Sequence, residues 1–450
     1  MNFLLIISII INLFGYLNDF PIYITAAQIL MCASFVVDHY KKYKLDKINP
    51  IIIFASTMAI TSFGHFLAFY NLDEKDNLYF QYFKYSIPQY YGEAMEIFYV
   101  GVLCVILGYN MGTRTSNFLP SIKVNVNSYS AFKTIFYLSV FLLLVQNAIK
   151  LPGSLQKIII LIPIVSLFIL NIIGHKYNVK LFKNYSAILT VLCIFINFLN
   201  SYLRFNIISP LILYIISLVI INKDVKFLFS FKSVPVILGI ILFTLSFSRI
   251  GKMRTKYYST MEQKIEYIIN GDQEDQEEIE DESKKQTILS RATVINQLTQ
   301  VVRVKEEDGL YYGKTLLYLG YVFIPRFVWP DKPIVQQGGW FAERIGLAYR
   351  NSAGQLNNSI NMTIYGEAYM NFDYYGVVLI SLFFGMLIAK LWQSSGGLSN
   401  YFNLVGVGYA LFLISYATFQ MGADLQIIVT FISVYLIFLF ISYLFNEFTK

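Results

Sequence analysis

Charge is scarce in this chain. Only 14% of its 450 residues are charged, while 56% are hydrophobic and 17% are aromatic. Soluble domains carry about 25% charged residues. A soluble core cannot hide this much apolar surface, so lipid must be the solvent for much of it. The net charge of +7 would suggest a nucleic-acid partner in a soluble protein, but here it is better explained by membrane topology.

Cysteine and histidine are scarce as well, with three of each. The cysteines all fall inside apolar runs, at Cys32, Cys104 and Cys193. They support neither a disulfide framework nor a metal site. The histidines are His39, His65 and His175. None lies in the long connection described below, which argues against a Ser-His-Asp hydrolase or a zinc protease.

Long apolar runs are what the chain has instead. A helix that crosses a bilayer needs about 20 apolar residues. Runs near this length number twelve, at 2–17, 22–38, 50–70, 94–112, 132–150, 158–174, 186–203, 206–222, 233–249, 374–392, 402–419 and 426–446. The sequence therefore predicts an all-α polytopic membrane protein with about twelve transmembrane helices. The runs hold almost no charge, which argues against proton-coupled or ion-coupled transport.

Basic residues predict the orientation of these runs. Lysine and arginine follow the even-numbered runs and are sparse in the alternate short connections. Because basic residues favour the cytoplasmic side, we expect both termini in the cytoplasm and the longest connection on the outer face. The chain then divides into a nine-helix bundle at 1–249, a large outer loop at 250–373 and three C-terminal spans at 374–450.

The nine arginines are distributed unevenly. Arg114 alone lies on the predicted cytoplasmic face. The others lie in the outer loop, at its edge or at a neighbouring hairpin, at Arg204, Arg249, Arg254, Arg291, Arg303, Arg326, Arg344 and Arg350. A guanidinium group grips phosphate through two parallel hydrogen bonds, so the set indicates a pyrophosphate or another anionic ligand. The alternative is that these arginines pair with acidic residues of the same loop or with lipid headgroups.

Two segments of the outer loop have distinct characters. The acidic insert 271–285 has no EF-hand spacing, and we expect it to be solvated rather than to bind calcium. The apolar stretch within 308–331 is too short to cross a bilayer, so it predicts a re-entrant or interfacial helix. The stretch stops at Pro325, and Pro330 and Pro333 prevent a helix from continuing. A rigid turn should then hold Arg326, Trp329, Asp331 and Lys332 near the membrane surface.

The end of the loop carries a lone carboxylate. Residues 336–350 predict a short amphipathic helix. Residues 364–376 follow and lead into the tenth run, and Glu367 lies there among aromatic and small residues. Partial burial would raise the pKa of Glu367 and suit it to proton transfer. The alternative is a structural carboxylate paired with an arginine. Taken alone, the aromatic residues of the loop favour membrane anchors over sugar-stacking faces.

Two stretches, IPRFVWPDKP at 324–333 and IYGEAYMNFDYYGVV at 364–378, resemble the oligosaccharide repeat unit polymerases, which are the Wzy-type O-antigen and capsule polymerases. In that family a Pro-Arg-x-x-Trp-Pro-x-Lys-Pro stretch precedes a Gly-Glu-x-Tyr-x-Asn-Phe-Gly stretch on the large outer loop. Asp373 stands here where the family tends to have glycine. Over the rest of the chain the resemblance is limited to the many-helix layout, which would be a GT-C-like bundle.

The resemblance implies an inverting glycosyltransferase that needs no metal, nucleotide or other cofactor. It would move a growing glycan from undecaprenyl pyrophosphate onto a fresh lipid-linked repeat unit, on the outer face of the bacterial cytoplasmic (inner) membrane. The product would be the O-antigen of lipopolysaccharide or a capsule. The implied partners are the lipid-linked oligosaccharide, the bilayer, a chain-length regulator and a flippase, and no nucleic acid.

The resemblance and the distribution of arginines together lead to a hypothesis for residue roles, in which Arg291 is a weaker candidate than the other arginines. The catalytic residues would be Arg326 and Glu367, with Glu367 orienting or deprotonating the acceptor hydroxyl. Arg326 would bind pyrophosphate together with Arg204, Arg249 and Arg291, because fixed arginines in a water-poor site stabilise the charge of the leaving group. The sugar path would be lined by Trp329, Tyr365 and Trp340.

Two other functions stay open. A lipid-linked oligosaccharide flippase or another transporter would place basic residues inside its spans, whereas here they collect in one loop. An O-antigen ligase-type glycosyltransferase tends to use a histidine of the outer loop, and this loop has none.

Replacing Arg326 with alanine is expected to shorten the surface polysaccharide, because the pyrophosphate would lose a fixed positive charge. The length distribution of surface glycan on a gel measures this effect. Long chains from a stably expressed Arg326→Ala protein would contradict the assignment.

Overall fold

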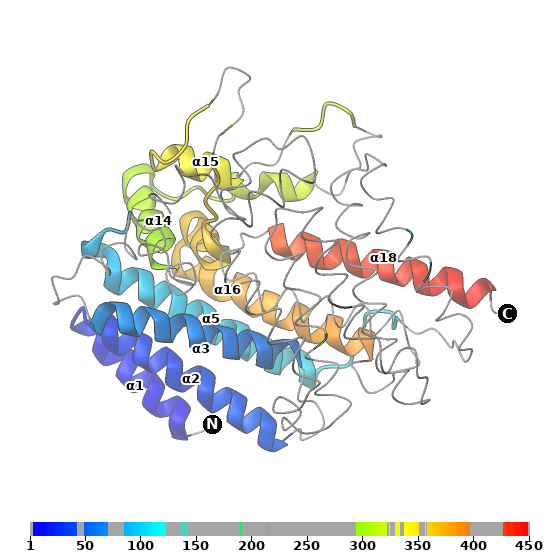
Figure 1. The fold of residues 1–450 in the computed structure, drawn as a ribbon, viewed down its shortest axis with the longest axis horizontal. Helices are drawn as coiled ribbons and strands as arrows, with labels where there is room; N and C mark the ends of the chain where they lie inside the picture. The colour runs from blue at the N-terminus through cyan, green and yellow to red at the C-terminus, as the bar shows by residue number, and fades with distance from the viewer. Residues whose placement is uncertain are drawn as a thin grey trace, which may run out of the picture. The chain divides into compact units, whose positions relative to one another are not determined.

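The structure is a computed structural model that describes residues 3–42, 49–70, 85–122, 294–321, 329–333, 337–350, 358–396 and 426–448, with single positions between them. The chain divides into two compact units. Most described residues belong to the unit formed by Met1–Ser121, Lys284–Ser394 and Tyr416–Phe440. The fold below is that of this unit (Figure 1).

The described residues form helices and no strand. The α-helices are α1 (Phe3–Leu17), α2 (Pro21–Lys42), α3 (Pro50–Tyr70), α5 (Tyr91–Arg114), α14 (Ile295–Asp308), α15 (Gln337–Arg344), α16 (Thr363–Ser395) and α18 (Gln426–Phe448). Two 3₁₀ helices, η1 (Pro88–Tyr90) and η4 (Lys314–Gly320), accompany them. One isolated antiparallel bridge joins Arg350 and Leu356.

Four of these helices are long and apolar enough to cross a membrane. They are Pro21–His39, Pro50–Tyr70, Pro88–Arg114 and Thr363–Ser395. The helical fold and the membrane character are therefore confirmed. Six predicted spans, from 132–150 to 233–249 and at 402–419, lie outside the described residues, so the count of twelve and the large outer loop stay predictions.

Helix α1 faces its polar side inward. Its buried residues are Ser8, Asn12 and Gly15, which recur at helical spacing on one face. Large apolar side chains such as Ile10 and Leu13 are exposed. In water this arrangement would be unfavourable, but in lipid it puts apolar surface against acyl chains and polar groups against protein. The polar face of α1 packs on α2 and α5.

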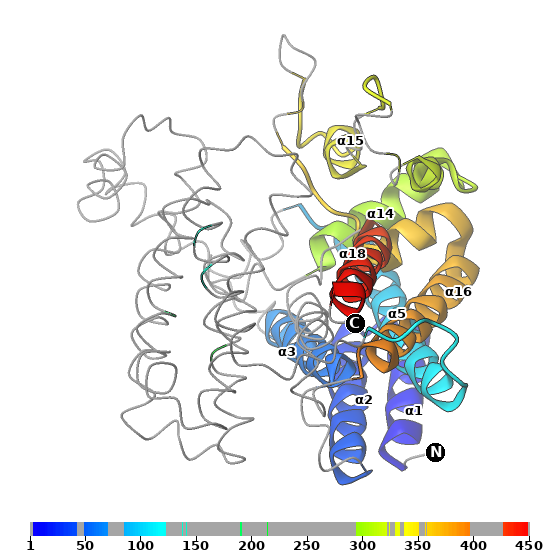
Figure 2. The same cartoon turned by 90° about the vertical axis from the view of Figure 1, so that its right-hand side faces the viewer.

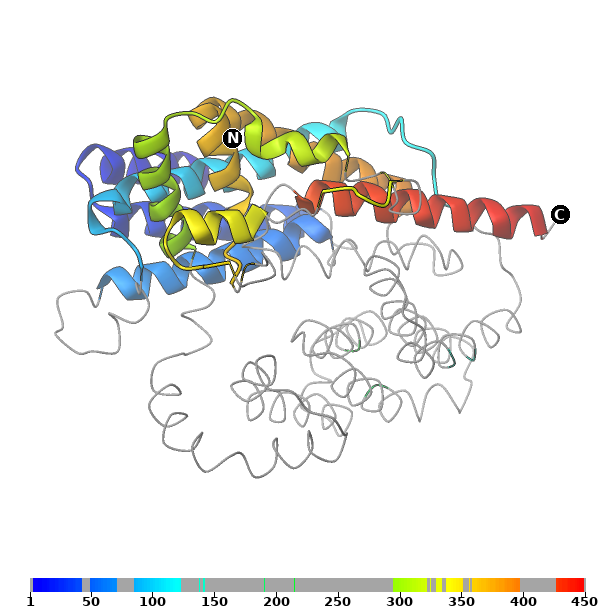
Figure 3. The ribbon, with the colours of Figure 1, turned by 90° about the horizontal axis from the view of Figure 1, so that it is seen from above.

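Helices α5 and α16 touch through their backbones (Figures 1 and 2). A Cβ atom on Gly108 would overlap the carbonyl oxygen of Leu382, and one on Gly385 would overlap that of Val105. Small residues allow this approach, which is a common means of joining helices within a bilayer. Stacked rings of Phe384 and Phe431, with centroids 5.7 Å apart, join α16 to α18 on another side (Figure 3).

Helix α16 is longer than the predicted run at 374–392, and it is kinked. It begins at Thr363 and bends where Phe372 and Asp373 leave helical geometry, with φ of 57° at Asp373. The first half packs on α14, where Gly366 contacts Leu298 and Val301 closely enough that a Cβ would lie 3.0 Å from Val301. This burial explains why residues 363–371, which the sequence places in the outer loop, form a helix continuous with the predicted span.

The far end of α16 holds the end of α5. The ammonium group of Lys390, 5% exposed, donates to the carbonyl oxygens of Thr115 (2.8 Å) and Ser116 (2.9 Å). Carbonyls at a helix C-terminus lack partners within the helix, and a lysine there satisfies them and offsets the negative end of the dipole.

Gly108→Ala is expected to lower the free energy of unfolding by about 1–3 kcal/mol, because its methyl group must displace backbone. Thermal unfolding of the purified protein in detergent measures the loss. Gly320→Ala is the matched control, since nothing lies within 4 Å of a Cβ there. Equal melting temperatures for the two variants would contradict the close crossing.

Candidate functional site

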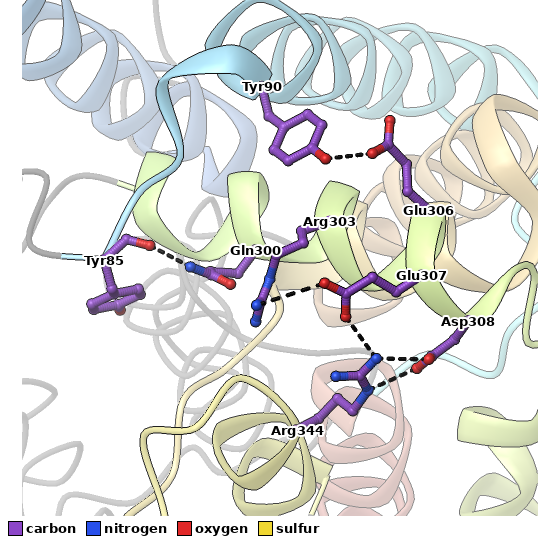
Figure 4. A network of polar contacts seen from close by, with 8 residues as sticks. All are labelled: Tyr85, Tyr90, Gln300, Arg303, Glu306, Glu307, Asp308 and Arg344. Carbon is purple, nitrogen blue, oxygen red and sulfur yellow. Dashed lines mark hydrogen bonds and ion pairs between the residues drawn. The ribbon is translucent and has the colours of Figure 1, made fainter.

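The candidate site lies where α14, the segment 309–320 and the first half of α16 meet. Helix α14 is held in place from several sides. The backbone N–H of Val294 donates to Nε2 of His65 in α3 (3.0 Å). Gln300 donates to the carbonyl of Tyr85 (2.5 Å), and the Tyr90 hydroxyl donates to Glu306. The first contact joins α14 to α3, and the other two join it to the residues that lead into α5 (Figure 4).

The segment after α14 caps the kink of α16. The backbone N–H groups of Tyr311 and Tyr312 donate to the carbonyls of Met370 (3.0 Å) and Asn371 (3.2 Å). These carbonyls end the first helical half and would otherwise lack partners. Gly309 and Gly313 flank the segment with φ of 75° and 84°, a backbone region that glycine enters without steric cost.

Beneath this cap lies a cluster that we call the Glu367 cluster, formed by Glu367, Asn371, Thr315 and Gln337. The Thr315 hydroxyl donates to Oε1 of Glu367 (3.2 Å), and Nδ2 of Asn371 donates to the Thr315 hydroxyl (2.6 Å). Gln337 of α15 donates to the carbonyl of Thr315 (2.8 Å). Glu367 and Asn371 have no exposed surface.

Asn371 organises the Glu367 cluster. It lies four residues after Glu367, so both side chains project from one face of α16. Its Nδ2 also donates to the carbonyl of Glu367 (2.7 Å), and its Oδ1 accepts from the N–H of Gly313 (2.9 Å). One amide thus fixes both the helix and the segment above it, which is what a buried amide requires.

A second set of contacts stabilises the kink itself. Lys305 of α14 pairs with Oδ2 of Asp373 (2.9 Å) and donates to the Tyr369 hydroxyl (3.0 Å). Tyr369 in turn donates to Glu93 of α5. Oδ1 of Asp373 accepts from the N–H of Tyr374 (2.7 Å). Asp373 therefore occupies a positive-φ position suited to glycine, with two side-chain contacts to offset the strain.

Carboxylates at the end of α14 bind Arg344 of α15 (Figure 4). Arg344 donates to both oxygens of Asp308, at 2.9 and 2.7 Å, and to Glu307 at 2.8 Å. The hydrogen bonds from Arg344, and then from Tyr311, lower the pKa of Asp308 to about 2. Burial, and then the hydrogen bond to Asp308, raises the pKa of Tyr311 to about 12.

Every arginine of the described part of the predicted loop pairs with a nearby carboxylate. Arg344 does so as above, Arg303 lies 3.7 Å from Glu307, and Arg350 makes two bonds to Glu343 at 2.8 and 2.7 Å. Pairing with acidic residues, the alternative to anion binding, accounts for these three. The arginines predicted to bind pyrophosphate, Arg204, Arg249, Arg291 and Arg326, lie outside the described residues, as does the acidic insert 271–285.

The predicted sugar-lining residues differ in their surroundings. Trp329 is 39% exposed and meets Tyr321 edge-on, with centroids 6.0 Å apart. Trp340 meets Tyr311 edge-on at 5.4 Å. Tyr365 is buried between α16 and α5, where its ring fills the space over Gly101. These contacts give Tyr365 a helix-packing role, and sugar stacking by any of the three stays a prediction.

The turn and the short helices of the loop are partly as predicted. The N–H of Lys332 donates to the carbonyl of Trp329 (3.2 Å), which closes the expected proline-rich turn. In the described part of the apolar stretch, Lys314–Gly320 forms the 3₁₀ helix η4, where a longer helix was predicted. The amphipathic helix α15 ends before the predicted residue 350, because a Schellman motif closes it. The backbone N–H groups of Gly346 (φ 76°) and Leu347 donate to the carbonyls of Glu343 and Ala342.

Sequence reasoning missed three residues that organise the site, namely Thr315, Asn371 and Lys305. The spacing of Asn371 from Glu367 was a usable signal, since four residues separate neighbours on one helix face. Thr315 and Lys305 reach the site only through tertiary contacts.

Compared with known proteins, the chain matches no family model, no curated protein and no solved structure.

Asp308→Asn is expected to loosen α15 from α14, because Arg344 loses its strongest partner. Backbone amide exchange over Gln337–Arg344 should accelerate. Glu306→Gln is the control, since Glu306 lies on the same helix but bonds Tyr90. Because the pKa of Asp308 is lowered, its stabilising effect is complete above about pH 4 and is lost toward pH 2. The difference between wild type and variant should vanish over that window, and equal exchange at neutral pH would contradict the role of the pair.

Proposed function

We propose that this chain is a glycosyltransferase that joins lipid-linked oligosaccharide repeat units into a surface polysaccharide, on the outer face of the bacterial cytoplasmic membrane. The Glu367 cluster is the observation that carries the proposal. It binds the helix that contains GEAYMNFD to the segment that leads into IPRFVWPDKP. This link between one stretch and the segment that precedes the other supports treating the two stretches as one site.

The proposed leaving group is undecaprenyl pyrophosphate, which gains negative charge as the glycosidic bond breaks. Arg204, Arg249, Arg291 and Arg326 are the candidates to bind it. Fixed guanidinium groups supply this stabilisation without a metal ion. The edge-on contact of Tyr321 with Trp329 supports a role for Arg326, because it holds together the two ends of the segment that contains Arg326.

Glu367 most directly serves as a positioning residue in this proposal. A side chain with no exposed surface does not meet an acceptor hydroxyl in this conformation. Its bond from Thr315 instead fixes η4, the element that precedes Arg326 in the chain. Deprotonation of the acceptor by Glu367 stays a prediction that the variants below distinguish from positioning.

The proposal is tested with purified protein in liposomes that contain lipid-linked repeat units as the only substrate. A polymerase yields a ladder of lengthened products. A flippase moves the units across the bilayer without lengthening them, and a ligase needs a second, different acceptor lipid. Absence of a ladder from folded protein supplied with its own repeat unit overturns the proposal.

In the same assay, Glu367→Ala is expected to lower the rate of ladder formation by about 100-fold or more, since the cluster loses its centre. Glu367→Gln keeps an oxygen that accepts from Thr315, so a positioning role predicts a loss of no more than about tenfold. A general base predicts equal losses of about 10²–10⁴ for both variants. Equal losses would therefore contradict positioning, and wild-type rates in both variants would remove Glu367 from the site.

A further inference from the structure

Away from the Glu367 cluster, α1, α2 and α5 enclose a second set of polar side chains. The Ser8 hydroxyl donates to the carbonyl of Ala27 (2.8 Å) and lies 2.9 Å from the Tyr99 hydroxyl. One turn along α1, Nδ2 of Asn12 donates to Oε2 of Glu96 (2.8 Å). The sequence indicated spans almost without charge, yet Glu96 lies within the membrane-spanning stretch Pro88–Arg114.

Glu96 has no cationic partner among the described residues, and its hydrogen-bond partner is Asn12. A carboxylate inside a membrane bundle is costly unless it is paired or neutralised. Intramembrane carboxylates are therefore rare outside functional sites. A positive charge from outside the chain would offset this cost.

Two residues of α1 and α2 carry buried polar atoms without partners: Asn12, which bonds Glu96, and Gln28. Asn12 is 6% exposed and its Oδ1 accepts no hydrogen bond. Gln28 of α2 has no exposed surface, and neither Oε1 nor Nε2 has a partner. Such orphaned groups are rare in proteins and indicate a missing water or ion.

The helix register places Gln28 near the level of Glu96. Ala27, the residue before Gln28, accepts a hydrogen bond from Ser8, whose hydroxyl lies 2.9 Å from the Tyr99 hydroxyl. Glu96 lies one turn before Tyr99 on α5, and α2 packs against α5. Both helices run from the same end of the bundle (Figure 1), so Gln28, beside Ala27, lies within about one helical turn of Glu96.

We infer that Glu96, Asn12 and Gln28 form a binding site for a sodium ion. The ligands would be one carboxylate and two amide oxygens, with the hydroxyls of Ser8 and Tyr99 nearby. Hard oxygen ligands suit hard cations and not zinc or copper. The described residues hold no group of three Asp, Glu, His or Cys that fits a metal ion, so a single charge suits this site better than the calcium sites built from several carboxylates. The inference does not depend on the proposed glycosyltransferase function.

The test measures binding of ²²Na⁺ to the purified full-length protein in detergent, together with thermal unfolding in NaCl and in choline chloride. Wild type is expected to bind Na⁺ saturably, and its melting temperature should rise with the logarithm of Na⁺ concentration. The choline series should show no such rise. Wild type that neither binds Na⁺ saturably nor gains stability from it overturns the proposal, whatever the variants do.

Glu96→Gln keeps the shape of the side chain and is expected to weaken Na⁺ binding more than about tenfold, because ligand charge sets cation affinity. Gln28→Leu should weaken it by removing one oxygen ligand. Glu93→Gln is the matched control, a carboxylate one turn away on the same helix that is bonded to Tyr369, and it should bind Na⁺ as wild type does. Unchanged affinity in Glu96→Gln, or an equal loss in Glu93→Gln, overturns the assignment of the site.

Discussion

A polar group buried among lipid-facing helices must find its partner within the protein, because no water is present to take that place. Much of the described unit depends on this constraint. The carbonyls that end the first half of α16 are satisfied by Tyr311 and Tyr312, and those beyond α5 by Lys390. Asn371 uses its amide group on three partners at once. These bonds fix the kink of α16, and the kink fixes the segment that carries the resemblance.

The charged residues at the end of the bundle are partly exposed, yet they too are paired within the protein. Arg344 donates three hydrogen bonds to carboxylates and Arg350 donates two. Their charge therefore stabilises α14, α15 and the segment after it. The excess of arginine in the predicted loop therefore has two sources. Some arginines stabilise the fold by pairing with carboxylates, and only arginines without such partners are candidates to bind pyrophosphate. Composition alone does not distinguish the two groups.

The kink of α16 shows how a residue other than glycine is accommodated at a positive φ. Asp373 stands where the resembled family tends to have glycine, and its backbone takes a positive φ. A side chain there is strained, but its carboxylate pairs with Lys305 and accepts from the N–H of Tyr374. The turn that glycine would allow is thus retained through two contacts that glycine does not make.

The sequence by itself determined the helical, membrane-embedded character of the chain and the position of its first spans. The run predicted at 50–70 matches α3, and those at 22–38 and 94–112 lie within α2 and α5, because bilayer thickness requires long apolar runs that local composition displays. It also determined the proline-rich turn after Trp329. Only the tertiary structure decided that 363–371 is helical, and that Thr315 meets Glu367, Arg344 meets Asp308 and Asn12 meets Glu96. These pairs join residues far apart in the chain, and no local period encodes which buried polar group will meet which partner.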